Sequence, residues 1–304
     1  MRKPALISAT LAVALGLAVA GGAGSSAKAK ARLGSYRGLA TWVDIYDPKA
    51  WVSPEATVSA MRPRGVRTLF LETGNYHQRT AIVRSALAAR FIEAAHAQGI
   101  KVVAWYLPSF GKSRRDYLRS LAAIRFRTPT GQSFDSFALD IEASVVKSVP
   151  LRTARLIDLS TRIRAAVGSS YALGAIIPSP RGMQLLPRYW PAFPYAALGD
   201  IYDVFLPMGY FSYRPRDLGG PYGYTTRNVA LIREGSGSPT MPVHAIGGLA
   251  DEVGPGQARA FVRAARTCGV IGASLYDFTT TRPGAWRGLA RVPARGAAPQ
   301  PACS

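Results

Sequence analysis

The chain has 304 residues, of which 48% are hydrophobic, so it can form one large domain or two small ones. It carries 38 basic against 17 acidic residues, a formal net charge of +21, which favours anionic partners such as acidic lipids or cell-wall polymers. No compact Lys/Arg run and no nucleic-acid motif is found, which argues against nucleic acid, and two Cys with three His exclude a metal site unless several acids join them.

The first 31 residues have the pattern of a secretory signal peptide. A basic head, Met1–Pro4, precedes the uncharged apolar run Ala5–Ala20, and small-residue cleavage sites follow within Ala27–Ala31. An uncleaved membrane anchor is the alternative, but the run is shorter than the about 20 apolar residues that are usual for a membrane span. We therefore expect a secreted or cell-wall-associated protein without stable membrane insertion.

Eight short apolar segments follow along the chain. Their near-continuous apolar character is typical of buried parallel strands. The segments are Gly38–Asp44, Val66–Glu72, Ile100–Tyr106, Phe134–Glu142, Ala172–Ile177, Tyr202–Met208, Met241–Ile246 and Val270–Tyr276.

Amphipathic helical patterns separate most of these segments. The clearest are Thr80–Gln98, Arg114–Phe126, Leu151–Val167 and Gly256–Thr267. Eightfold strand–helix alternation over roughly 250 residues predicts an α/β fold, a single-domain (β/α)8 TIM barrel over residues 32–290. An open doubly wound sheet is the alternative, but no Gly-rich phosphate turn follows a predicted strand. We expect Gln184–Gly199 to be an irregular loop and residues 291–304 to form a tail.

Two carboxylates stand at the end of the fourth predicted strand. Asp140 and Glu142 flank Ile141, so both leave an extended chain on the same side. Paired carboxyl groups raise each other's cost of ionisation, so one can stay protonated as an acid while the other is charged, as glycosidic bond cleavage requires. If the strand continues through Ala143, we expect Glu142 to be the more buried of the two, with a raised pKa. Two solvated acids at a strand end are the alternative.

The other acids and many aromatic residues also fall at predicted strand ends. Asp44, Glu72 and Asp277 are candidates for substrate contact or for tying down loop amides, with Glu72 favouring function. Because flat sugar faces stack on aromatic rings and Tyr hydroxyls bond sugar oxygens, the aromatic residues predict a carbohydrate groove. They are Trp42, Tyr46, Trp105, Tyr106, Tyr210, Tyr213 and Tyr276.

Other hydrolytic chemistries lack their motifs. The sequence has no Gly-x-Ser-x-Gly elbow, no Cys with a nearby His and no metal-ligand spacing, so we expect neither a metal nor a cofactor. In an oxidising compartment, Cys268 and Cys303 could pair and pin the tail to the last helix.

The strand-four stretch resembles the signature of glycoside hydrolase family 18, the chitinase family, Asp-Gly-x-Asp-x-Asp-x-Glu. Asp135, Asp140 and Glu142 match its first Asp, last Asp and Glu, whereas Ala138 replaces the middle Asp. The Leu-Asp-Ile-Glu core also resembles the strand-four acids of family 25, the wall-degrading lysozymes. With that resemblance the partner acids would come from strand one, where Asp44 lies.

A second family-18 motif, Met-x-Tyr-Asp on strand six, resembles Met208-Gly-Tyr210, with Phe211 in place of the Asp, and Tyr276 could be its strand-eight aromatic residue. The resemblance implies that Glu142 is the general acid and that Asp140 and Tyr210 bind the acetamido group of the substrate.

These observations lead to a secreted hydrolase of glycosidic bonds in a polysaccharide, with an amino-sugar polymer such as peptidoglycan or chitin as the target. A carbohydrate-binding barrel without activity is the alternative, and the missing acids at Ala138 and Phe211 favour it. A deacetylase or lyase is a third possibility, although the absence of His/Asp metal spacing argues against the deacetylase.

Overall fold

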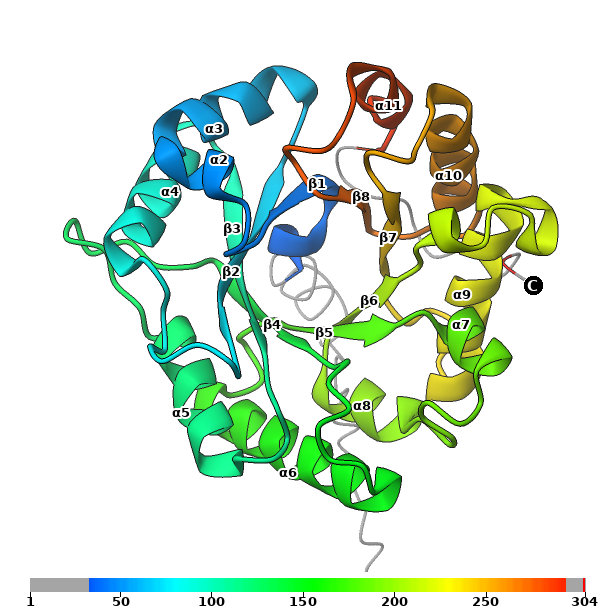
Figure 1. Cartoon of the computed structure of the whole chain (residues 1–304), viewed down its shortest axis with the longest axis horizontal. Coiled ribbons are helices and arrows are strands. Elements are labelled where there is room, and N and C mark those ends of the chain that lie inside the picture. The colour runs from blue at the N-terminus through cyan, green and yellow to red at the C-terminus, as the bar shows by residue number, and fades with distance from the viewer. Residues whose placement is uncertain (1–32, 294–302, 304) are drawn as a thin grey trace, which may run out of the picture. The chain divides into compact units, whose positions relative to one another are not determined.

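The computed structural model describes residues 33–293 and residue 303. Eight parallel strands close into a barrel in sequence order, and helices surround it (Figure 1). The predicted single-domain (β/α)8 TIM barrel is therefore confirmed. The strands are β1 (Gly38–Val43), β2 (Thr68–Asn75), β3 (Lys101–Leu107), β4 (Ser136–Asp140), β5 (Leu173–Pro178), β6 (Val204–Met208), β7 (His244–Leu249) and β8 (Gly272–Tyr276).

Helices and short 3-10 turns connect the strands. The α-helices are α2 (Pro48–Val52), α3 (Pro54–Met61), α4 (Ser85–Ala97), α5 (Ser113–Ile124), α6 (Val149–Val167), α7 (Pro180–Leu185), α8 (Tyr195–Ile201), α9 (Pro221–Ser236), α10 (Pro255–Thr267) and α11 (Pro283–Leu289). The 3-10 turns are η1 (Gly34–Tyr36), η2 (Arg62–Arg64), η3 (Phe211–Tyr213) and η4 (Asp217–Gly219).

Two sequence-based boundaries are wrong. The helix predicted from Thr80 begins only at Ser85, because Arg84 adopts a left-handed conformation with φ 50°, which cannot continue a right-handed helix. The segment predicted to be an irregular loop contains the start of α8, which directly follows Pro194. Its Pro-rich composition concealed this short helix.

The amino-terminal end of the barrel interior is filled. Tyr36 enters from η1, and its hydroxyl donates to the carbonyl oxygen of Phe137 at 2.8 Å. Gly272 makes this possible, since a Cβ there would lie 2.3 Å from the Tyr36 carbonyl oxygen. The same carbonyl accepts a 2.8 Å hydrogen bond from Nδ1 of His244, and burial lowers the His244 pKa to about 4, so this imidazole is neutral. With this end closed, the barrel opens at the carboxyl ends of the strands.

The structure joins Cys268, at the end of α10, to Cys303 through a disulfide whose Cα atoms are 4.8 Å apart. The bond closes a loop of 35 residues and holds residue 303 of the tail against the barrel.

The remaining sequence-based expectations for the chain ends fall largely outside the described residues. The predicted signal peptide, residues 1–31, lies there, as do residues 294–302 and 304 of the predicted tail. Among the described residues, no helix is long and apolar enough to cross a membrane.

Candidate active site

Three buried carboxylates form the upper layer of the barrel interior. Asp44 follows β1, Glu72 belongs to β2 and Asp140 ends β4, and their side chains are only 8%, 2% and 5% exposed. Each stands two residues beyond an inward-facing apolar side chain of its strand, so strand alternation directs all three into the barrel. The charge of Asp44 acts on Glu72 and that of Glu72 acts on Asp140, so the three carboxyl groups lie around one space.

The barrel opening at the carboxyl ends of the strands is called the mouth below. Asp140 lies at its floor and has an oxygen without a hydrogen-bond partner among the described residues. Its Oδ1 is fully buried and has no hydrogen-bond partner among the described residues, and neither has the buried indole nitrogen of Trp105 on the neighbouring strand β3. Burial raises the pKa of Asp140 well above its usual range, and the nearby carboxylates of Glu142 and Glu72 raise it further. Unpaired buried polar atoms are costly, and here two of them lie on neighbouring strands.

Glu142 stands higher in the mouth than expected. The strand ends at Asp140, and only the amide of Ile141 continues the ladder, donating to the Ile176 carbonyl at 2.7 Å. The prediction that Glu142 is the more buried of the pair is therefore wrong, because its side chain is exposed. The surrounding walls still remove part of its water, and this desolvation raises its pKa as predicted. Glu142 is thus the carboxyl group that a ligand can reach.

Glu72 is held by two donors and is nevertheless protonated easily. Its Oε2 accepts from the amide of Ile45 and its Oε1 from Nδ2 of Asn75, both at 3.1 Å. Burial outweighs these bonds, and with the charges of Asp44 and Glu142 it raises the pKa of Glu72 to about 7. A carboxyl group with this pKa can give or take a proton near neutral pH.

The two remaining strand-end acids differ in role. Asp44 accepts from the amide of Tyr46 at 2.7 Å and from the hydroxyl of Tyr276, so it braces the aromatic wall of the mouth. Asp277 accepts through Oδ1 from the amide of Thr280 at 3.0 Å and the hydroxyl of Thr279 at 3.1 Å. Asp277 therefore ties its own loop together, the structural alternative considered for it.

Tyr210 and Tyr276 form the wall beside the carboxylates. Their ring centroids are 6.2 Å apart, and Tyr213, which is largely exposed, meets Tyr210 edge-on at 5.9 Å. Burial raises the pKa of Tyr210, and the carboxylates of Asp140 and Glu142 add to this, so its hydroxyl keeps its proton.

Two predicted substrate-binding aromatics do not line the mouth. Trp42 is 2% exposed, stacks on Phe70 with centroids 4.2 Å apart and donates to Ser274, so it packs the barrel interior below the acids. Tyr106 follows the inward-facing Trp105 and therefore points outward, where its hydroxyl donates to Oδ1 of Asp116 at 2.8 Å.

The two side chains that depart from the family-18 motif lie in apolar surroundings. Ala138, below Asp140, is fully buried, and so is Phe211, whose ring centroid lies 5.9 Å from that of Phe261. The motif's first acid, Asp135, precedes β4 at the opposite end of the barrel, where it pairs with Lys101 and His96. Neither Asp135 nor a middle acid lies beside Asp140, and the carboxyl groups that do act on it are those of Glu142 and Glu72.

Two contacts in the mouth were not found from the sequence. Asn75 donates to Glu72 and also to the Tyr46 hydroxyl at 2.8 Å, and its place three residues after a strand-end acid was the available signal. Tyr189 donates to the carbonyl oxygen of Glu142 from a loop whose irregular sequence gave no signal. The described part of the chain holds no group of three or more His, Cys, Asp or Glu side chains suited to a metal ion.

The fold is shared with solved glycoside hydrolases at low identity. The Bacillus cereus spore cortex-lytic enzyme SleL matches with TM-score 0.62 and 12% identity over 83% of this chain and 73% of that chain. A class V chitinase from Pseudomonas fluorescens gives TM-score 0.60 and 11% identity over 83% and 98%. An endo-1,4-beta-mannanase from Rhizomucor miehei gives 0.60 and 10% over 84% and 95%. No protein-family model and no curated protein sequence matches this chain. These likenesses establish the fold.

Proposed function

We propose that this protein is a glycoside hydrolase that cleaves a polysaccharide in the carboxyl-terminal mouth of its barrel. The observation that carries the proposal is the set of carboxyl groups there: Glu142 is exposed, Asp140 and Glu72 are buried beside it, and loss of surrounding water raises the pKa of all three. Gathering acids in one mouth is electrostatically costly, because the carboxylates repel one another and lose water, and a bound ligand or a reaction can offset this cost.

Glu142 is the general acid in this proposal. It is the exposed member of the set, and its raised pKa keeps a proton available for the leaving oxygen of the glycosidic bond. The hydroxyl of Tyr189 holds the Glu142 carbonyl, which fixes the start of the segment after β4. As the leaving oxygen takes this proton and its bond to the sugar ring breaks, positive charge develops on the ring; water then adds to the ring carbon and returns a proton to the Glu142 carboxylate.

The carboxyl groups of Asp140 and Glu72 stabilise the positive charge that develops on the sugar ring. In the protein alone, burial and the neighbouring carboxylates favour the neutral form of Asp140. A positive charge above the floor reverses this balance, because an opposite charge within about 4–6 Å favours the ionised form. The hydroxyl of Tyr210, whose pKa the charges of Asp140 and Glu142 help to raise, donates a hydrogen bond to the substrate. Asp44 and Tyr276 shape the adjoining wall.

An amino-sugar polymer is the target that we propose, with export through the amino-terminal signal sequence. The Asp140-Ile-Glu142 and Met208-Gly-Tyr210 motifs support this target, and a chitinase and a spore cortex-lytic enzyme share the fold. Mannanases share it equally, so the choice of sugar depends on the motifs. Amino-terminal sequencing of secreted protein should give a mature chain that begins between Lys28 and Arg32, and a chain that begins at Met1 would contradict export with cleavage.

A carbohydrate-binding barrel without activity is the second candidate. It is favoured by the buried apolar side chains of Ala138 and Phe211 at two positions where the chitinase motif has acids. Digestion of a polysaccharide panel by the mature protein separates the two candidates. Release of soluble sugar by the wild type but not by Glu142→Gln supports the hydrolase, and glycan binding without release by either protein supports the binding barrel.

A further inference from the structure

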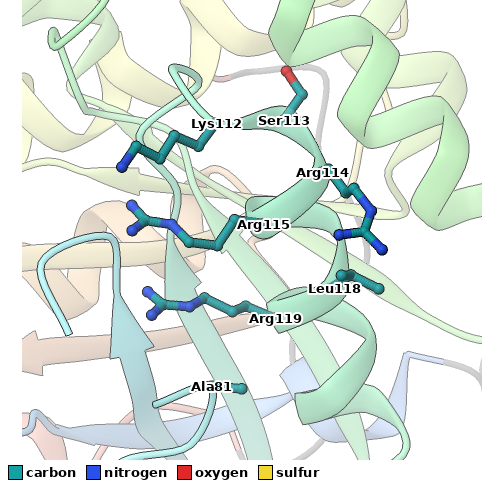
Figure 2. A pocket seen from close by; sticks show the side chains of 7 residues that line it. All are labelled: Ala81, Lys112, Ser113, Arg114, Arg115, Leu118 and Arg119. Atoms are coloured by element: carbon teal, nitrogen blue, oxygen red, sulfur yellow. The ribbon is translucent and has the colours of Figure 1, made fainter. Parts of the chain in front are cut away.

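A cationic cavity lies where the loop after β2 meets the first turns of α5. Its volume is about 570 Å³, and Lys112, Arg114, Arg115 and Arg119 line it together with Ala81. Figure 2 shows Lys112, Arg115 and Arg119 extending from the same side of α5, as expected for the spacing of these residues on a helix. The segments after β2 and β3 supply these residues, and such segments lie at the carboxyl-terminal end of the barrel.

The charges in this cavity are not neutralised. Arg115 donates to the carbonyl oxygen of Tyr76 at 2.9 Å, and Arg119 donates to that of Asn75 at 2.8 Å. Both acceptors are uncharged. Within residues 33–293 and residue 303, no salt bridge joins any of the four basic side chains to a carboxylate.

The acidic residue of α5, Asp116, is hydrogen-bonded to groups that do not line the cavity. Asp116 is fully buried and accepts from the hydroxyl of Tyr106 at 2.8 Å, from Ser109 at 3.1 Å and from the amide of Phe110 at 3.0 Å. It therefore faces the strand and the loop that leads into the helix. Lys112, Arg114 and Arg115 form no salt bridge among the described residues, whereas the buried Arg119 lies beside the Tyr106 hydroxyl that Asp116 binds.

Hydrogen-bond donors remain available in the cavity. Among the described residues, the exposed ammonium group of Lys112 makes no hydrogen bond, and Nε of Arg115 also lacks a partner, although protein atoms cover it. Helix α5 begins here without a side-chain cap, so its positive dipole end adds to the field of the side chains.

We propose that this cavity binds an anionic group, a carboxylate or a phosphate, carried by the polysaccharide that enters the mouth. The inference rests on the proposed function of the mouth and adds the substrate class, an anionic polysaccharide. The two sites adjoin, because Arg119 holds the carbonyl of Asn75 while the side chain of Asn75 holds Glu72. One residue thus separates the cationic cavity from the carboxylate floor.

The juxtaposition of the two sites favours a polysaccharide over nucleic acid. A polymer with a phosphate on every unit would bring negative charge over Asp44, Glu72, Asp140 and Glu142, which repel it. A polysaccharide with spaced charges can lay a neutral ring against Tyr210 and place its anionic group in the cavity.

The test measures binding of purified bacterial wall polysaccharide in three preparations: untreated, freed of its phosphate polymers, and with its carboxyl groups amidated. The variant is Lys112→Gln/Arg115→Gln. The control is Arg125→Gln/Arg127→Gln, which removes the same charge from exposed positions just after α5 that do not line the cavity. We expect the first variant to bind the untreated polymer about tenfold more weakly than the control does, the effect of one net charge-assisted hydrogen bond.

The two treated preparations identify the anion. Weaker wild-type binding after phosphate removal indicates a phosphate, and weaker binding after amidation indicates a carboxylate. Equal binding by the variant and the control overturns the inference, and so does preferential competition by double-stranded DNA. If the double variant does not fold, Lys112→Gln alone decides, since the Lys112 ammonium group makes no hydrogen bond within the described part of the chain.

Hydrolysis is measured separately on the same proteins, so the two proposals fail independently. Binding that depends on Lys112 and Arg115 without any turnover removes the hydrolase and keeps the cavity. Turnover by a variant that binds as well as the control removes the cavity and keeps the hydrolase.

Discussion

Asp135 and Asp140 lie at opposite ends of β4 and have opposite environments. Asp135, at the amino end, accepts from the amide of Val102 at 2.8 Å and pairs with Lys101 at 2.9 Å and with His96. Although burial opposes it, this set of partners lowers the pKa of Asp135. Asp140, at the carboxyl end, is more buried, has an oxygen without a partner among the described residues and has a raised pKa.

This difference separates an acid that stabilises the fold from one that the fold leaves unsatisfied. The partners of Asp135 supply positive charge and an amide hydrogen, whereas the neighbours of Asp140 are other carboxyl groups. An unsatisfied buried acid costs stability, so its presence indicates a function for the mouth. Substitutions at each end should therefore affect different properties.

Glu142→Gln should give the largest effect, because it tests the carboxyl end as a reactive site. Gln keeps the shape of the side chain but has no acidic proton, and loss of a general acid typically lowers the rate about 10²–10⁴-fold. Glycan binding should survive. Initial rates of sugar release and a binding isotherm, measured on the same protein, check both expectations, and undiminished hydrolysis would contradict the mechanism.

Asp140→Asn should lower the rate by about 10²–10³-fold, the usual cost of removing one electrostatic contribution to a transition state. It should also change the acid limb of the pH–rate profile, because the ionisation of Asp140, which burial and the carboxylates of Glu142 and Glu72 move to higher pH, no longer limits the rate. Stability at neutral pH should not fall, since Asn brings no charge into this buried site, where Oδ1 of Asp140 has no partner among the described residues. Rate profiles and urea unfolding measure these effects, and a stable variant with the wild-type profile would refute the assignment.

Asp135→Asn should show the reverse behaviour. The substitution removes the charge that Lys101 and His96 face, and losing charged hydrogen bonds costs about 2 kcal/mol of unfolding free energy. The rate at saturating substrate should stay within about twofold of wild type, because Asp135 is at the closed end of the barrel. Denaturant unfolding measures the stability and initial rates measure the activity. A variant that loses activity without losing stability would contradict the contrast between Asp135 and Asp140.

The sequence predicted the barrel and its acids for a direct physical reason. Apolar runs identify buried strands, and the carboxyl ends of parallel strands meet, so the positions of Asp44, Glu72 and Asp140 followed from counting. The same alternation that places Trp105 inside places Tyr106 outside, so that error was avoidable.

Other features depended on tertiary structure. The exposure of Glu142 depends on where pairing between β4 and β5 ends, which is a property of two strands rather than one. The contact of Tyr189 with Glu142 joins residues 47 apart through a loop without periodicity. The cavity on α5 requires the loop after β2 to bend back onto the helix, and no local pattern encodes that approach.

Glu72→Gln should give the smallest effect, a change in how the free energy of unfolding depends on pH. The folded-state pKa of Glu72 is about 7, above its ordinary value of 4.5, so the folded protein binds a proton that the unfolded chain releases. The stability that this proton contributes is therefore present below pH 4.5 and is lost as the pH rises through about 7. Between about pH 6 and about pH 8 this group alone should lower the unfolding free energy by about 1 kcal/mol.

The glutamine side chain of this variant cannot titrate, so urea unfolding should show a shallower decline with pH for Glu72→Gln than for the wild type. One of the bonds from Ile45 and Asn75 is also lost in the variant, but this cost is the same at both pH values and does not change the slope. Glu252→Gln, at an exposed position before α10, is the matched control and should keep the wild-type slope. Equal slopes for all three proteins would mean that Glu72 is already ionised in the folded mouth, and the electrostatic contrast between the two ends of the barrel would then be restricted to Asp140 and Glu142.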